Sequence, residues 1–460
     1  METKNSLENY GLKIPEILLP KKGTDLKKWA VIACDQYTQD REYWKKVEDF
    51  VGDSPSTLRI TLPEVYLNDG DKTERIEKIN STMKEYLENG VFAPALENMI
   101  YIERITEYGR LRRGLVMAID LEEYDWKPEE KAKIRATEAT ILERIPPRVE
   151  IRKKASIELP HIMLLVNDRD KKLVEKTGEL AKSSDGSKIA PNAKDAKNTP
   201  LYETKLMQNS GSISGWKVDE SIVEKCVLPS LEKISADQTC DDGSVFLFAV
   251  GDGNHSLATA KTIWNELKAN GASKDSPARY ALVEIVNIYD EGLTFEPIHR
   301  VLFNVNCGEL IEFLCKKLNG SVVEVAEEAA LEKAVGSSKA DFGFVWSKDG
   351  KKKFTLLKTP ITSLAVSALQ PALDEFLDEH GNTKEDIDYI HGSDEVFRLG
   401  GKDGADVAVS CTKPAVSILL PPIAKDTFFA TIAKTGSLPR KSFSMGEASE
   451  KRFYMEARKL

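Results

Sequence analysis

One junction in the second half of the chain does most to restrict its fold. Residues 244–250 (SVFLFAV) form a short, nearly continuous apolar run, which is typical of a buried strand. The sequence GDGNH at 251–255, called here the GDGNH junction, ends that run, and an amphipathic helical pattern then continues to about Asn270. A buried strand that leads through a turn into a helix indicates an α/β or mixed α+β fold, with mixed β-sheets and flanking helices.

The rest of the chain alternates predicted strands and helices. The patterns predict strands at 29–34, 98–106, 114–120, 160–166, 279–289 and 415–420, and helices at 40–51, 73–89, 128–145, 309–318, 426–435 and 446–458. They also predict a hairpin between 279–289 and 293–303, and a second one around Asp349-Gly350. A polar stretch at 183–200 suggests a junction, so we expect an N-terminal α/β domain at 1–166, a polar connecting segment at 167–200 and a C-terminal α/β domain at 201–460.

Composition narrows the classes of function. The 460 residues include 65 basic and 74 acidic side chains, a net charge of -9, which disfavours binding to nucleic acid or to an anionic membrane. The six cysteines have neither zinc-site spacing nor the density of a disulfide scaffold, and no run of 18 apolar residues occurs. We therefore expect a cytoplasmic protein with free thiols, which could still bind phosphates through a local basic pocket, and an oligomer is possible.

The GDGNH junction is the first candidate site. Gly251 and Gly253 permit a tight turn and close approach of a ligand, and the start of the following helix suits a phosphate group. Asp252, Asn254 and His255 add an acid, an amide and an imidazole within one turn. The sequence is neither a Rossmann fingerprint nor a Walker A loop. The alternative is a structural turn in which Asp252 or Asn254 only caps the helix.

Two carboxylates in the first half are further candidates. Asp35 follows an apolar strand, on the side of an α/β sheet where ligands usually bind, and Tyr37 lies two residues beyond it. Glu138 falls within the apolar stripe of the helix predicted at 128–145, with Arg135 three residues before it. Glu138 is either a positioned base or ligand, or one half of a structural ion pair with Arg135.

Two pairs in the second half complete the candidates. His299 and Arg300 lie on the predicted hairpin strand, where His299 would pair near Val283, next to the GDGNH strand; a strand histidine is more often structural. Arg440 and Lys441, on a short loop after a helix, could clamp a phosphate or could simply be solvated surface.

Several segments together resemble a known family. They are the block WAVIACDQYTQDREYWKKVEDFVGDSPSTL, the stretch RATEATILERIPPRVEIR, the junction GDGNHSLATAK, the segment PIHRVL and the late loop LPRKSF. In this order they resemble domain-of-unknown-function family 1015 over nearly the whole chain. The typical members of that family have a junction similar to the nucleotide loop of ParB/sulfiredoxin-like proteins, so the resemblance implies a core of that type in the second half.

The resemblance implies a small-molecule kinase that uses ATP and Mg²⁺, most simply on free L-serine. The typical junction of the family is matched here by Asp252, Gly253 and His255. Asn254 replaces a histidine of that junction, and Ser256 replaces the arginine that contacts phosphate in the wider group. In the stretch around 137, Thr137 replaces another histidine, and Glu138 is retained. The alternatives are a nucleotide-binding regulatory module and a hydrolase of phosphate esters.

This reading gives every candidate residue a role. The expected catalytic residues are Asp252, Glu138 and His255. The nucleotide would be bound by Gly251, Gly253, Asn254, Arg440 and Lys441. The substrate would be bound by His299, Arg300, Arg135 and Tyr37, and the metal would be held by Asp35.

Overall fold

A computed structural model describes residues 6–138, 145–183, 199–383, 386–402 and 414–460. The contacts divide the chain into two compact units: unit 1 combines Met1–Leu293 with Gly446–Leu460, and unit 2 is Thr294–Met445. The mixed α/β class predicted from the sequence is confirmed, with mixed sheets flanked by helices. The predicted domain limits and the ParB/sulfiredoxin-like core stay predictions.

Unit 1 is built on one large mixed sheet. Its strand order in the described residues is β11-β12-β5-β6-β14-β10-β13-β8-β7, and β1 also pairs with β6. The strands are β1 (Leu12–Lys13), β5 (Met99–Ile105), β6 (Leu111–Asp120), β7 (Tyr124–Asp125), β8 (Ile134–Ala136), β10 (Ile162–Val166), β11 (Tyr202–Lys205), β12 (Ser212–Val218), β13 (Phe248–Asp252) and β14 (Tyr280–Asn287). β10 pairs antiparallel with β13 and parallel with β14, so the strand that carries the GDGNH junction lies well inside the sheet.

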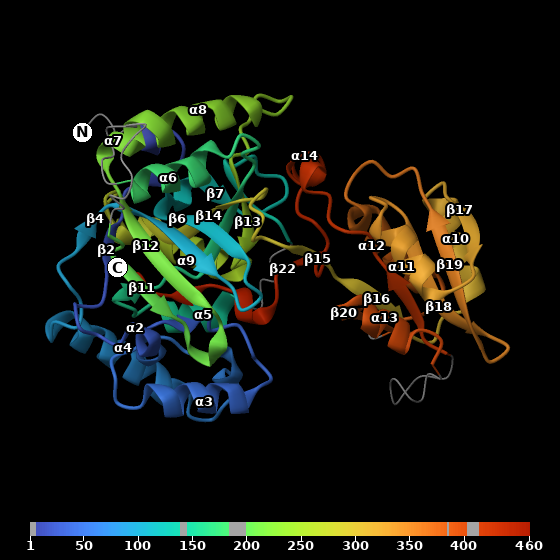
Figure 1. Cartoon of the computed structure of the whole chain (residues 1–460), viewed down its shortest axis with the longest axis horizontal. Helices are drawn as coiled ribbons and strands as arrows, with labels where there is room; N and C mark the ends of the chain where they lie inside the picture. Colours follow the sequence, from blue (N-terminus) through green and yellow to red (C-terminus); the bar gives the residue numbers. More distant parts are fainter. Residues whose placement is uncertain (1–5, 139–144, 184–198, 384–385, 403–413) are drawn as a thin grey trace. The chain divides into compact units, whose positions relative to one another are not determined.

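Helices cover both faces of this sheet (Figure 1). One core joins Leu115, Leu164 and Val250 to Leu231 and Trp264 of the helices on that face. The opposite core joins the other sheet face to Trp29 and Trp44. The helices of unit 1 are α2 (Leu26–Trp29), α3 (Arg41–Val51), α4 (Lys72–Glu88), α5 (Ile145–Arg152), α6 (Thr177–Lys182), α7 (Glu220–Ile222), α8 (Leu228–Asp237) and α9 (Asn254–Ala269), with π-helices η5 (Lys172–Lys176) and η7 (Val223–Val227) and 3-10 turns η1 (Thr57–Ile60), η2 (Glu64–Tyr66), η3 (Leu121–Glu123), η6 (Met207–Asn209) and η8 (Pro277–Arg279).

The end of the chain is not the predicted helix 446–458. It forms the 3-10 turn η11 (Ala448–Glu450) and two short strands, β23 (Phe453–Tyr454), which pairs with β3 (Val31–Ile32), and β24 (Ala457–Lys459), which pairs with β2 (Glu16–Leu18) and β9 (Ile157–Glu158). A further short strand, β4 (Leu96–Glu97), pairs with β2. Pairing with distant strands and burial of Arg452 and Glu456 outweigh the helix propensity of this Glu- and Lys-rich segment.

The helix predicted at 128–145 is also wrong. Ile134–Ala136 is instead the strand β8, which pairs in parallel with β13 and β7, and all three of its residues are buried. Residues 139–144 lie outside the described part, and a helix, α5, begins only at Ile145. Long-range strand pairing has overridden the local pattern here.

The hairpin predicted between 279–289 and 293–303 does not form. Both edges of β14 are occupied, by β6 and β10, so no edge remains for the following segment. Residues 290–292 make a tight turn in which Asp290 Oδ1 accepts a hydrogen bond from Gly292 N at 2.8 Å. His299 instead belongs to a strand of unit 2, where it lies opposite Ile390, and Val283 pairs with Met117 and Ile162.

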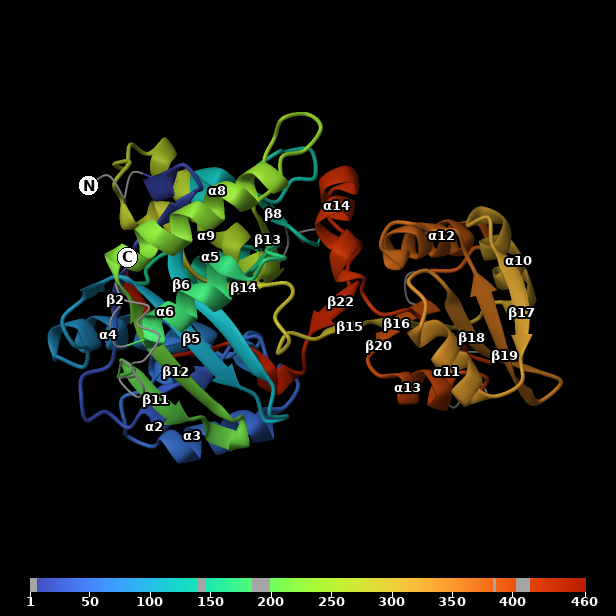
Figure 2. The same ribbon diagram turned by 45° about the horizontal axis from the view of Figure 1, so that its top comes forward.

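Unit 2 contains an antiparallel sheet in the order β17-β19-β18-β21-β16-β20 and a separate pair, β15-β22. Figure 2 shows α10 and α12 on one side of the sheet and α11 and α13 on the other. The elements are β15 (Phe295–Pro297), β16 (His299–Leu302), β17 (Ser321–Val325), β18 (Phe342–Lys348), β19 (Lys351–Lys358), β20 (Ile387–Ile390), β21 (Val416–Leu419), β22 (Phe443–Met445), α10 (Cys307–Lys317), α11 (Glu328–Gly336), α12 (Ala365–Glu379), α13 (Ser393–Leu399) and α14 (Lys425–Thr435). The hairpin predicted around Asp349-Gly350 is confirmed by the pairing of β18 with β19.

Candidate functional site

The GDGNH junction makes a close turn against the start of β10. β13 continues through Asp252, and Gly253 then takes a left-handed conformation with φ of 85° and begins α9. A Cβ atom at Gly253 would lie 3.1 Å from Ile162 Cα and 3.2 Å from His161 Cδ2. Both the positive φ and this approach require glycine, so the turn brings the backbone at Gly253 close to His161.

Asp252 is paired with a lysine from the far end of the chain. Its Oδ2 lies 3.2 Å from Lys451 Nζ, and its Oδ1 accepts a hydrogen bond from Gly253 N at 2.9 Å. Asp252 Oδ1 accepts from Gly253 N and Asn254 Oδ1 from Thr137 N, not from N–H groups inside the first turn of α9, so these contacts do not favour the alternative in which either residue only caps the helix. The side chains of Asp252 and Lys451 keep 23% and 13% exposure, which leaves both accessible to a ligand.

Asn254 ties the start of α9 to the strand beside it. Its Oδ1 accepts from Thr137 N at 3.3 Å, and Thr137 Oγ1 donates to Val250 O at 2.6 Å. Glu138 follows Thr137 and is half-buried, so it lies one residue from a direct contact of the junction. Because 134–136 is a strand, the helical spacing that suggested an Arg135–Glu138 pair does not apply. Arg135 instead bonds Ala132 O and Ser244 Oγ and lies over the Phe246 ring.

Asp35 belongs to a second polar group beside the junction. Its Oδ2 lies 3.4 Å from His161 Nε2, and its Oδ1 accepts from Gln36 Nε2 at 2.8 Å. The other ring nitrogen, His161 Nδ1, lies 2.6 Å from Tyr454 Oη, which accepts a hydrogen bond from Cys34 N at 3.0 Å. The imidazole of His161 is therefore fixed between a carboxylate and a phenol.

Electrostatics hold Asp35 and His161 as an ion pair. Burial alone would raise the pKa of Asp35, but the charge and hydrogen bond of His161, the Gln36 amide and the charge of Lys451 together lower it below its usual range. Burial alone would lower the pKa of His161, but Tyr454 and Asp35 raise it well above its usual value. Lys451 thus acts on both Asp35 and Asp252 and links the two polar groups.

A third acid–base pair flanks this group. Glu64, in η2, pairs with Arg148 of α5, and Glu64 N donates to Cys34 O at 2.8 Å. Burial raises the pKa of Glu64, the Arg148 charge opposes that rise, and the Asp35 charge adds to it. The seven side chains that these contacts bring together are called here the junction cluster: Asp35, Glu64, Arg148, His161, Asp252, Lys451 and Tyr454.

The junction cluster offers Mg²⁺ no preformed cage. Within the described ranges, no three His, Cys, Asp or Glu side chains converge as metal ligands. Asp35 and Asp252 each already face a cationic side chain. Mg²⁺ often uses only one or two carboxylates together with substrate phosphates, so an ion entering with a nucleotide could use either residue. The role of Asp35 as a metal ligand stays a prediction.

Four of the candidates belong to unit 2. His299 is buried, and its Nδ1 accepts from Leu420 N at 3.0 Å; burial, then Arg300 and His391, lower its pKa to about 4. Arg300 is fully buried and bonds Gln370 Oε1 at 2.8 Å and Ile298 O at 2.6 Å. These contacts favour the structural alternative for both residues.

Arg440 and Lys441 follow α14 on an exposed loop of unit 2. Asp252, His255, His299 and Arg440 each lie at a strand end or a glycine-stopped loop in the sequence, which predicts that they line one cleft. Because these residues belong to both units, that shared cleft stays a prediction.

Two remaining candidates lie near the junction cluster in sequence. Tyr37 is half-buried and stacks on Tyr43, with ring centroids 3.9 Å apart. His255 lies in the first turn of α9, where its carbonyl accepts from Thr259 Oγ1 at 2.7 Å. Both keep partial exposure next to elements of the cluster.

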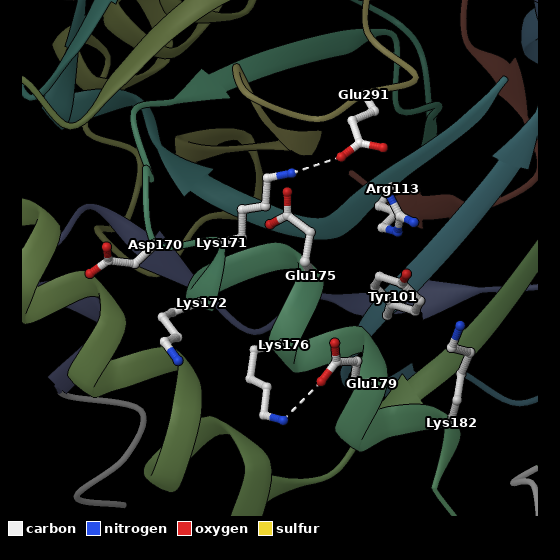
Figure 3. Close-up of a pocket in the computed structure, with 10 residues that line it drawn as sticks. All are labelled: Tyr101, Arg113, Asp170, Lys171, Lys172, Glu175, Lys176, Glu179, Lys182 and Glu291. Carbon is white, nitrogen blue, oxygen red and sulfur yellow. Dashed lines mark hydrogen bonds and ion pairs between the residues drawn. The ribbon is translucent and has the colours of Figure 1, made fainter.

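A charged cavity of about 570 Å³ lies elsewhere in unit 1 (Figure 3). It is lined by Tyr101, Arg113, Asp170, Lys171, Lys172, Glu175, Lys176, Glu179, Lys182 and Glu291. Lys171 pairs with Glu291 at 3.2 Å and Lys176 with Glu179 at 2.8 Å, as the dashed lines in Figure 3 mark. Because acidic side chains balance the basic ones, the net positive charge that this cavity presents to an anion is much smaller than its lysines alone suggest. The cavity shares no residue with the junction cluster.

Sequence reasoning missed most of the junction cluster. His161 was hidden in a segment interpreted only as a strand, although it directly precedes the buried strand β10. Lys451 and Tyr454 were hidden in the supposed terminal helix; the aromatic pair Phe453-Tyr454 was the available signal for a strand there. Glu64 and Arg148 carried no local signal.

Comparison with known families identifies the chain. The model of the family described as "Protein of unknown function (DUF1015)" matches residues 18–376. The chain belongs to this family. The resemblance drawn from the sequence is thereby confirmed, although the description assigns the family no activity.

Solved structures give weaker likenesses. A free serine kinase in complex with AMP has 14% identity and a TM-score of 0.34, with 74% of this chain and 90% of that chain covered. A conserved hypothetical protein from Pyrococcus furiosus has 13% identity and a TM-score of 0.32, covering 75% and 94%. SbnI with a C-terminal truncation, from Staphylococcus aureus, has 8% identity and a TM-score of 0.31, covering 72% and 82%. Such low values carry no information on activity.

Two searches, one among curated proteins and one for membrane-spanning helices, give negative results. No curated protein matches the chain. In the part of the chain that the structure describes, no helix has both the length and the apolar character needed to cross a membrane.

Proposed function

We propose that the chain is an ATP-dependent kinase of a small molecule, which transfers the γ-phosphate to the hydroxyl of a free amino acid, L-serine first among them. The reaction class comes from the sequence resemblance. The observation that supports assigning this reaction to particular residues is the position of Asp252. It lies between a buried strand and the start of a long helix, and its Oδ2 is 3.2 Å from Lys451 Nζ.

The parts of the junction match the needs of phosphoryl transfer, which are mainly positioning and neutralisation of charge. The Gly251–Gly253 backbone and the first turn of α9, including Asn254, would bind phosphate oxygens. Asp252 would accept the proton of the substrate hydroxyl while that oxygen bonds to the γ-phosphorus and the bond to the ADP oxygen breaks. Glu138 is the second candidate base because it follows Thr137, which contacts Asn254. Mg²⁺, when bound with the nucleotide, would neutralise charge on its phosphates.

The remaining roles follow from the contacts. Asp35 and His161 would act as a fixed ion pair beside the reacting groups, and Asp35 keeps its proposed part in holding the metal. His255 and Tyr37 would contact the substrate. Arg440 and Lys441 stay proposed phosphate contacts from unit 2; the buried contacts of His299, Arg300 and Arg135 give those three the weaker claim on substrate.

The test is to incubate the purified chain with ATP, Mg²⁺ and single free amino acids, and to measure ADP and phosphorylated product together. ADP formed in equal amount with O-phosphoserine supports the proposal. Free phosphate without a new ester would indicate the hydrolase alternative. Nucleotide binding without turnover on any amino acid would indicate the regulatory module.

A further inference from the structure

We propose that Lys451 contacts the phosphate held at the GDGNH junction. This inference rests on the proposed function, because it assumes a phosphate ligand at that place. It assigns a binding role to the C-terminal segment 446–460, which the family match over 18–376 does not include.

Lys451 has the position that such a contact requires. Its Nζ lies 3.2 Å from Asp252 Oδ2, one residue from the glycine that begins α9. The side chain is 13% exposed, so water screens its charge only partly while part of the side chain stays accessible. An ammonium group has three donors, and one of them on Asp252 leaves two for phosphate oxygens.

The backbone on both sides of Lys451 is fixed before any ligand binds. On one side, Glu450 pairs with Arg110 at 2.7 Å. On the other, Arg452 is buried and pairs with Glu284 at 2.5 Å and with Glu456. The lysine is thus presented from an anchored segment, which lowers the entropy lost when it binds a phosphate.

The other cationic side chains considered for this phosphate pair with groups other than Asp252 or belong to unit 2. Arg148 is paired with Glu64, and His161 lies between Asp35 and Tyr454. Arg440 and Lys441 belong to unit 2. Among the described side chains of the junction cluster, Lys451 is therefore the cation that pairs with Asp252, the carboxylate of the phosphate-binding turn itself.

The experiment compares binding of ADP and of adenosine to the full chain by titration calorimetry. Loss of one charge-assisted contact predicts that Lys451→Met weakens ADP binding by about 10- to 100-fold. Adenosine has no phosphate, so its affinity should change less than about twofold. Lys451→Arg should keep most of the ADP affinity. Lys459→Met, an exposed lysine of the same segment, is the matched control and should bind like wild type.

A double variant separates a phosphate contact from a structural role. If Lys451 only neutralised Asp252, then Asp252→Asn combined with Lys451→Met would restore ADP binding; the proposal expects no such rescue. Lys451→Gln, which can still bond to Asp252, replaces Lys451→Met if the latter does not fold. Unchanged ADP affinity in folded Lys451→Met or Lys451→Gln, or rescue in the double variant, would overturn this inference alone. Absence of ADP binding by wild type would overturn the proposed function and this inference with it.

Discussion

Each unit holds a histidine with little exposure at the start of a strand, and the pKa values of the two imidazoles are shifted in opposite directions. In unit 1, His161 lies between Asp35 and Tyr454, which raise its pKa well above the usual value. In unit 2, His299 accepts a hydrogen bond from Leu420 N beside the fully buried Arg300, and burial with that charge lowers its pKa to about 4. One histidine is held charged by an acid; the other is held neutral by its surroundings.

This difference shows that the groups in contact with a histidine, and not the residue type itself, distinguish a candidate site from a structural polar group. Around His161, carboxylates and cations stay partly exposed, and the glycine turn at 251–253 opens beside them. Around His299, backbone and amide groups are satisfied inside the core of unit 2. On this comparison we place the proposed chemistry in the junction cluster of unit 1.

The largest effect is expected from Asp252→Asn. The substitution keeps size and hydrogen bonding but removes the proposed base, so turnover should fall by about 10²- to 10⁴-fold. Stability should change by less than about 1 kcal/mol, because the side chain is partly exposed and asparagine still accepts from Gly253 N. The measurement is serine-dependent ADP formation beside a thermal melt, with exposed Asp241→Asn as the control. Turnover within a few-fold of wild type would remove Asp252 as the base and point to Glu138.

The second prediction concerns acid stability of unit 2. Between an unfolded pKa near 6.5 and a folded pKa of about 4, the unfolded state binds a proton at His299 that the folded state does not. The free energy of unfolding should therefore decrease as the pH falls from about 6.5 to about 4, and neutral His299 accounts for at most about 3 kcal/mol of that decrease. The measurement is the unfolding free energy of wild type and of His299→Gln between pH 7 and pH 4. A difference between them that stays constant with pH would contradict the neutral state of His299.

The third prediction reverses that dependence in unit 1. Because the folded pKa of His161 is raised, its contribution is present below about pH 6.5 and is lost as the pH rises through the folded pKa. Because the folded pKa of Asp35 is lowered, its contribution is present above about pH 4 and is lost as the pH falls. His161→Gln should therefore cost most, about 1–3 kcal/mol, between about pH 4 and 6.5. A cost that grew steadily above pH 7 would contradict the ion pair.

Much of the fold was open to prediction because its signals are local. Helices expected at 40–51 and 73–89 appear as α3 and α4; Asp40 caps the start of α3, Gly52 ends it, and Gly90 follows the end of α4. The failures are long-range: β8 and the C-terminal strands form because distant strands pair with them, which no local window contains. The same reason hid the junction cluster. Its strand–turn–helix core was found from sequence, but Tyr454 meets His161 across 293 residues of chain.

The smallest effect is expected from the paired cations of unit 2. Arg440 and Lys441 are both exposed, so any contact that they make with a phosphate is weakened by water and salt. Replacing both by alanine should lower ADP affinity by no more than about threefold, and that loss should vanish in high salt. Lys451→Met should lower it more, and part of its loss should persist in salt because that lysine is largely buried. The measurement is ADP titration of both variants at low and high ionic strength. An equal, salt-resistant loss in the Arg440–Lys441 variant would mean that unit 2 supplies the phosphate contact, and the contrast between the two units would have to be redrawn around a site that both of them build.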